Sequence, residues 1–362
     1  PASVASDVGA RLAFDGEASL AWENGGARLL ASTGSLSLSG LTVDDLRLRS
    51  ATLVLDSLAG DAGSIAGEGL LIAHLDAAEL RGLRLSLPLR IVYDANGTAA
   101  FLDRQGSITF PELPAAGSVA ADGPVTLRLE PARRPALRIG FDDPGAVRLE
   151  LPVVLPALGV DLKGGLPLRV GLGSAQGLMK ARFVAAPDGA RGGAVVSLAT
   201  PTIDVMPAEE DPAAPDGIAL AGVALEVRAS TGAGGFGLDR LVVSADSLSD
   251  RADQVRFSPV RLDGMARRTE DGPLTFTATV GGADGAFVLD AEGVHDIDTG
   301  RGRAHLTVYP LVFVPGGLQP VDLSPAASAM LRNASGSVSL AGAIEWPGRD
   351  VPPDDPLTLT LE

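Results

Sequence analysis

The chain of 362 residues has a formal net charge of −16, an apolar content of 46% and no cysteine. A charge of this sign repels phosphate backbones, which argues against nucleic acid as a partner and against docking to anionic headgroups through a basic patch. Without cysteine the chain has no disulfide, no thiolate metal site and no cysteine nucleophile.

Residues 34–56 read GSLSLSGLTVDDLRLRSATLVLD, in which apolar residues occupy every second position between short breaks. Such alternation predicts β-strands with one apolar face. The pattern recurs at 83–93, 125–129, 137–141, 147–153 and 165–172, and then at 223–229, 273–280, 285–293, 304–309 and 336–342. A strand about every ten to fifteen residues is typical of antiparallel meanders.

We expect an all-β fold: an elongated, mostly antiparallel sheet curled into an open hydrophobic groove, with at most one or two short helices. Helical periodicity is nearly absent. The best helix candidate is DLSPAASAMLRN at 322–333, with Ser324 as a cap and Pro325 at the first helical position. Met330 and Leu331 would face the sheet.

The domain organisation is predicted to be one continuous architecture. An N-terminal part of the groove (1–206) is followed by an acidic, proline-rich loop (207–217) and a C-terminal part (218–362). The first residues, PASVASDVGA, lack the basic start and apolar run of a signal peptide. The last, DPLTLTLE, stop within an alternating strand. The sequence therefore predicts a piece of a longer protein, truncated at both ends.

The apolar faces allow two interpretations. In a closed β-sandwich, two such faces meet and exclude water, and composition alone favours this because sandwiches are common. In an open trough, the face stays uncovered. Scarce helices and an aromatic content of only 4% favour the trough. A closed module would bind a glycan or a protein and would carry no lipid.

Two short motifs could indicate bound cofactors or metals. Gly232, Gly234 and Gly237 have the spacing of a dinucleotide fingerprint, but no amphipathic helix follows them, so a turn is the better interpretation. His295, Asp296, Asp298 and His305 lie close together in sequence. A hairpin turn at 298–300 explains this segment better than a metal site, because the other ligands of a calcium loop are missing.

The sequence contains no nucleotide-binding P-loop, no nucleophile elbow and no zinc-protease motif. We therefore expect a protein that is not an enzyme, with no catalytic residue, no metal and no cofactor.

The segment 309–346 carries a resemblance to a known family. Its pieces GLQP (317–320), DLSP (322–325) and GSVSLAG (336–342), followed by Trp346, resemble the bacterial YdbH-like family of the AsmA-like superfamily. The resemblance implies a repeating β-groove that carries phospholipid acyl chains from the inner to the outer membrane through the periplasm. It also implies a parent protein anchored in the inner membrane of a Gram-negative bacterium, and an outer-membrane lipoprotein partner docking outside this chain.

We expect the lining of the lipid groove to be formed by the apolar residues of the alternating strands. These are Leu36, Leu38, Leu46, Leu48, Leu53, Leu55, Leu83, Leu85, Leu87, Leu89, Ile91, Val125, Leu127, Leu129, Leu137, Ile139, Phe141, Val147, Leu149, Leu151, Leu166, Leu168, Val170, Leu225, Val227, Phe276, Leu306 and Val308.

Overall fold

The computed structural model describes residues 11–23, 26–43, 46–61, 63–77, 80–95, 97–111, 119–121, 124–140, 146–162, 168–186, 189–207, 217–232, 235–253, 255–268, 272–282, 285, 287–296, 299–329, 331, 333–348 and 358–361. Its strands are β1 (Arg11–Glu23), β2 (Gly26–Val43), β3 (Leu46–Gly60), β4 (Ile65–Ala77), β5 (Leu80–Asp94), β6 (Gly97–Leu102), β7 (Gly106–Phe110), β8 (Val119–Ala121), β9 (Val125–Leu129), β10 (Leu137–Ile139), β11 (Ala146–Leu155), β12 (Leu158–Leu162), β13 (Leu168–Leu172), β14 (Ala175–Ala186), β15 (Gly189–Pro207), β16 (Ile218–Gly232), β17 (Gly235–Asp250), β18 (Val260–Arg268), β19 (Leu274–Gly282), β20 (Val288–His295), β21 (Gly302–Phe313), β22 (Gly336–Trp346) and β23 (Thr358–Leu361).

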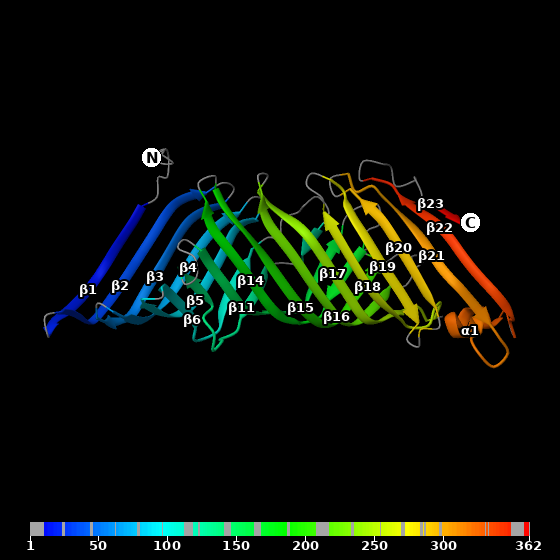
Figure 1. The fold of residues 1–362 in the computed structure, drawn as a ribbon, viewed down its shortest axis with the longest axis horizontal. Helices are drawn as coiled ribbons and strands as arrows, with labels where there is room; N and C mark the ends of the chain where they lie inside the picture. The colour runs from blue at the N-terminus through cyan, green and yellow to red at the C-terminus, as the bar shows by residue number, and fades with distance from the viewer. Residues whose placement is uncertain are drawn as a thin grey trace.

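These strands form one antiparallel sheet that runs through the molecule in sequence order (Figure 1). From β1 to β5 and again from β14 to β23, each strand pairs with the next one. The expected all-β fold with a meandering antiparallel sheet is thus confirmed.

In the middle of the sheet the long strands also pair in sequence order, but each of them is interrupted. β6 and β7 both pair with β5 and are two parts of one long strand, broken at residues 103–105. β9 and β10 lie next to them and pair onward with β11. β11 with β12 and β13 with β14 likewise form two long neighbouring strands. No strand of this region leaves the meander.

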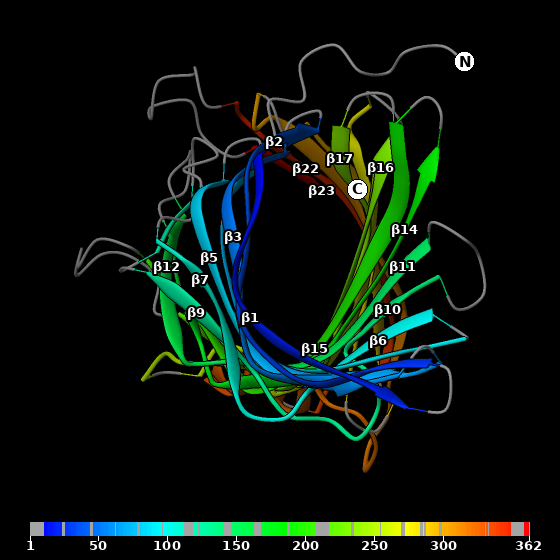
Figure 2. The same ribbon diagram turned by 90° about the vertical axis from the view of Figure 1, so that its left-hand side faces the viewer.

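The strands bend along a line of irregular positions. Pro156 and Ser174 interrupt two neighbouring long strands, and the regular pairing of the next strands skips Pro201, Gly222 and Asp246. Gly222 has a φ of +61°, a left-handed conformation that glycine adopts without strain. Bulges increase local twist and bending. Figure 2 shows the resulting curved wall along the long axis of the molecule, with β5, β7 and β9 on one side and β11 and β14 on the other.

The sheet is not sealed by a second layer. The accessible surface is 21816 Å², whereas a compact monomer of 36.7 kDa would expose about 13,500 Å². Among the described residues, the large side chains with under 2% exposure are Leu102, Leu129, Val153 and Val223. A closed sandwich would bury one whole face of every strand, so that alternative does not describe this fold.

The helical segment differs from the prediction. α1 spans Pro320–Leu323 and is followed by a 3₁₀ helix at Pro325–Ala329. Ser324 lies between the two helices in an extended conformation, with φ −141° and ψ 110°, and Pro325 is the first residue of the 3₁₀ helix, as predicted. The Ser324 hydroxyl donates to the Arg256 carbonyl and does not cap that helix. Leu331 is 57% exposed, so it does not pack on the sheet; Met330 lies outside the described residues.

The buried middle of the sheet should carry more stability than its first strand. Leu129 is fully buried, whereas Leu12 in β1 is 70% exposed. We expect Leu129→Ala to lower the free energy of unfolding by about 3 kcal/mol, through lost burial and the cavity left behind. Urea denaturation followed by circular dichroism measures this. Leu12→Ala is the control and should change the midpoint little; equal effects would contradict a core centred on Leu129.

Candidate functional site

The antiparallel register aligns apolar side chains from strand to strand. In the first part of the sheet, Phe14, Leu36, Leu53, Leu71 and Leu87 are directly opposed on β1 to β5. Alternate residues of a strand point to the same face, and neighbouring strands lie about 4.8 Å apart. These side chains therefore form a row across five strands on one surface, which we call the groove face.

A second row continues to the other end of the sheet. Its members are consecutive register partners on β14 to β23: Met179, Val196, Val227, Leu241, Ala266, Phe276, Gly293, Ala304, Ile344 and Leu359. Every member is apolar. The groove face therefore passes without a charged side chain along this row across ten strands.

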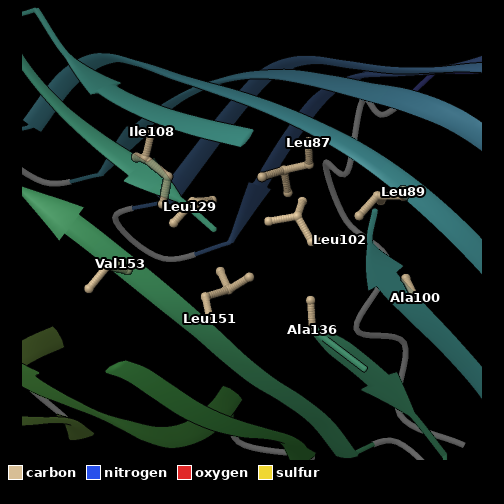
Figure 3. Packing of buried hydrophobic residues seen from close by; sticks show 9 residues of the cluster. All are labelled: Leu87, Leu89, Ala100, Leu102, Ile108, Leu129, Ala136, Leu151 and Val153. Carbon is tan, nitrogen blue, oxygen red and sulfur yellow. The ribbon is translucent and has the colours of Figure 1, made fainter. Parts of the chain in front are cut away.

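A buried cluster joins the two rows in the middle of the sheet. It comprises Leu87, Leu89, Ala100, Leu102, Ile108, Leu129, Ala136, Leu151 and Val153. Figure 3 shows these side chains gathered in one space from β5, β6, β7, β9 and β11. Met179 and Leu198 pack against the same cluster, which links it to β14 and β15.

The predicted lining residues fall on this face wherever the structure describes them. The register and the three buried clusters place together Leu36, Leu38, Leu48, Leu53, Leu55, Leu83, Leu85, Leu87, Leu89, Ile91, Val125, Leu127, Leu129, Leu137, Ile139, Val147, Leu149, Leu151, Leu168, Val170, Leu225, Val227, Phe276, Leu306 and Val308. Phe141, Leu166 and the side chain of Leu46 lie outside the described part of the chain.

Many residues of the groove face were not predicted from the sequence. Leu12 and Phe14 lie on β1, Met179 on β14 and Leu241 on β17. On β14 the face alternates small and large residues, Ala175, Gly177, Met179, Ala181 and Phe183, so few large apolar residues mark it. The sequence does contain a signal for this strand: its glycine and alanine residues occupy the same alternate positions as its larger apolar residues.

The opposite face of the sheet carries the charged side chains of these strands, together with some exposed apolar ones such as Val54 and Ile72. Arg148 and Glu150 on β11 alternate with groove-face residues and are opposed to Arg182 and Lys180 on β14. Exposed ion pairs such as Arg90–Asp103, at 3.4 Å, lie on or beside this surface. The sheet is thus amphipathic, with one face suited to water and the other to hydrocarbon.

Two aromatic rings on the groove face each lie over a glycine of a neighbouring strand. A Cβ atom at Gly302 would lie 2.1 Å from the ring of Trp346, and one at Gly293 would lie 2.5 Å from the ring of Phe276. The rings therefore lie flat over neighbouring strands. The indole N–H of Trp346 donates to Nδ1 of His295 over 3.2 Å, so this polar group of the face has a partner.

Gly234 and Asp298, members of the two motifs considered from sequence, lie outside the described residues, and the remaining members do not form a binding site. Gly232 ends β16 and pairs with Gly235 at the start of β17, so the glycine-rich segment connects two strands of a hairpin. His295 and His305 lie on opposite faces, because His295 opposes Gly302 and His305 opposes Glu292. Within the described residues, no group of three acidic, histidine or cysteine side chains could hold a metal ion.

Asp250 fixes the loop at the end of β17 and, through it, the helical segment. Its carboxylate accepts hydrogen bonds from the side chain and backbone N–H of Arg256, at 2.6 to 2.9 Å, and these hold its pKa well below the ordinary value. The same loop contacts the segment after β21: Ser258 N donates to the Leu323 carbonyl at 2.9 Å, and Ser324 donates to the Arg256 carbonyl.

Comparison with known proteins identifies a family. A family model described as "YdbH-like: Intermembrane phospholipid transport protein YdbH" matches residues 1–362, the whole chain. No curated protein and no solved structure matches the chain. The resemblance predicted from residues 309–346 is thus confirmed and extends over the full length. Of the helices described, none has the length and apolar character needed to cross a bilayer.

Removing the Asp250 charge should loosen the loop and the helical segment together. We expect Asp250→Asn to speed amide hydrogen exchange at 251–258 and 320–324. Because the folded pKa of Asp250 is depressed, its stabilisation is present above the unfolded pKa of about 3.9 and is lost as pH falls through the folded value.

Asp263→Asn is the matched control, since Asp263 makes an exposed pair with Arg261 at 3.2 Å, and such pairs contribute little. Equal exchange in both variants would show that Asp250 does not anchor the segment.

Proposed function

Because this chain belongs to the YdbH-like family of intermembrane phospholipid transport proteins, we propose that its groove face holds phospholipid acyl chains while their headgroups remain in water. The observation that supports this most is the unbroken row of apolar register partners from Met179 to Leu359. An uncovered apolar surface of this extent marks a binding surface, because soluble monomers rarely expose one.

The free energy that such a surface provides is large. An acyl chain of about sixteen carbons in water costs on the order of 12 kcal/mol, at about 0.8 kcal/mol for each methylene. Contact with leucine and valine side chains removes most of this cost. Hydrophobic and dispersion contacts have no fixed direction, so an acyl chain can shift from one row of side chains to the next without a large barrier.

The groove face reaches both edges of the sheet. Leu12 and Phe14 on β1 are 70% and 57% exposed, and Leu359 and Leu361 on β23 are 52% and 57% exposed. The row of apolar register partners from β14 to β23 crosses ten consecutive strands, and this extent supports passage of lipid along the sheet rather than storage at one site.

We further propose that the parts before and after residues 207–217 form one groove. β15 and β16 flank this loop and pair from Gly193–Ser230 to Val205–Ile218, and apolar residues oppose each other on both sides of the missing pair at Pro201 and Gly222. The parent protein would extend through the periplasm from an anchor in the inner membrane and meet an outer-membrane lipoprotein through regions outside this chain. The transfer itself needs no catalytic residue, metal or cofactor.

A charge on the groove face should remove lipid without unfolding the sheet. Leu241 and Val242 are neighbours on β17, partly buried on opposite faces. We expect Leu241→Asp to reduce the phospholipid that co-purifies with the protein roughly tenfold or more, since an unpaired carboxylate against hydrocarbon is very unfavourable. Lipid extraction followed by mass spectrometry measures this.

Val242→Asp is the matched control on the same strand and should keep its lipid. Circular dichroism must show intact β structure in both variants. Equal lipid content in Leu241→Asp and the unsubstituted protein, or loss of lipid in both variants, would contradict the proposed function.

A further inference from the structure

Three arginines stand side by side on the outer face, opposite to the groove. Arg138 on β10 directly opposes Arg148 on β11, which directly opposes Arg182 on β14. The row ends at Ala99 on β6 and Gly193 on β15, neither of which carries a charge. Like charges in directly opposed positions repel one another, so the row concentrates positive charge at one place on the sheet.

The arginine row lines a depression of about 480 Å³. Arg134 and Lys180 add two further cations to its wall, and Glu150 is the one carboxylate among the described residues that line it. Five cations against one carboxylate is a local excess of positive charge, in a chain whose net charge is −16. The whole-chain charge, which argued against a basic patch, therefore does not describe this part of the surface.

Arginine side chains are suited to binding oxyanions such as phosphate groups. The planar guanidinium presents N–H donors in a fork that matches the oxygens of a phosphate group, often through two parallel hydrogen bonds. Arg138, Arg148 and Arg182 also interact within the protein, and a guanidinium with five donors can hold an internal partner and a ligand together. Three guanidinium groups on neighbouring strands, about 4.8 Å apart, are close enough to donate hydrogen bonds to one tetrahedral anion.

We propose that this arginine row is a binding site for a phosphate group on the outer wall of the groove. Arg148 is the third residue of β11, so it lies about 7 Å from the start of that strand at 3.3 Å per residue. Figure 2 shows β10, β11 and β14 together in one wall of the sheet. The phosphate could belong to a phospholipid headgroup, as a diester, or to a free phosphate monoanion or dianion. The site does not depend on what fills the groove.

Two probes without acyl chains separate these sources, because neither can enter through the groove face. Isothermal titration of the purified chain with inorganic phosphate, and separately with glycerophosphoglycerol, measures affinity at constant ionic strength. Tighter binding of the diester assigns the site to lipid headgroups, and tighter binding of inorganic phosphate assigns it to free phosphate. We expect the double variant R148Q/R182Q to weaken binding about tenfold or more, since each fork makes charged hydrogen bonds.

R261Q/R303Q is the matched control, with two exposed arginines removed from β18 and β21 of the same face; its affinity should be unchanged. Circular dichroism must show intact β structure in R148Q/R182Q, so that a loss of binding reflects the missing guanidinium groups and not an unfolded sheet. Arg148→Lys, which keeps the charge but loses the fork, should also bind more weakly. The proposal is overturned if the unsubstituted chain binds neither probe, if R148Q/R182Q binds as well as it does, or if the control loses affinity equally.

Discussion

Cross-strand register is the constraint on which the rest of this structure depends. A strand shifted by one residue would turn its apolar side chains to the polar face. In the row from Met179 to Leu359, nine consecutive pairings keep the same phase. At Pro201 and Gly222 one pair is missing from the ladder while the register is kept, and the apolar phase changes on both strands together: Ile203 and Leu220 oppose each other beyond the break and pack into one cluster with Val223. Register therefore produces a continuous apolar surface from strands of different lengths and compositions.

An uncovered apolar face would ordinarily promote aggregation, and the fold limits this in two ways. The bends concentrated near Pro156, Ser174 and Gly222 curl the sheet, so that its apolar face lies on the inside of the curve. The outer face carries charged and hydroxyl side chains, including the pair Thr279–Asp290 at 2.7 Å and Tyr309–Asp290 at 2.9 Å. In the middle, around Leu102 and Leu129, the face closes on itself into the largest of the three buried clusters among the described residues, and a smaller one lies around Val223. Groove and core are thus parts of one surface that differ in how tightly it curves.

The sequence predicted the sheet and one side of most strands, because alternation at 34–56 and 83–93 is a local property. The separate alternating stretches 125–129 and 137–141 left residues 130–136 outside a strand, as the structure does, but the sequence analysis identified no strand on either side of the interruption at 103–105. It also missed Met179 and Phe183, whose strand places glycine and alanine on the apolar face. The helix expected at 322–333 is replaced by α1 and a short 3₁₀ helix that starts at Pro325, and the Ser324 hydroxyl bonds to the Arg256 carbonyl of a loop that is distant in the chain, which the local sequence does not reveal. The arginine row was invisible because Arg138, Arg148 and Arg182 meet only through pairing.

The most direct measurement asks whether hydrocarbon lies against the apolar side of the sheet. The chain has no cysteine, so a fluorophore can be attached at a single introduced cysteine on β16, either V227C or E226C. Each protein is loaded with a phospholipid that carries a nitroxide at the middle of one acyl chain. The account predicts strong quenching at position 227, on the apolar face, and little at position 226 beside it. Equal quenching at both positions, or none at 227, would contradict it.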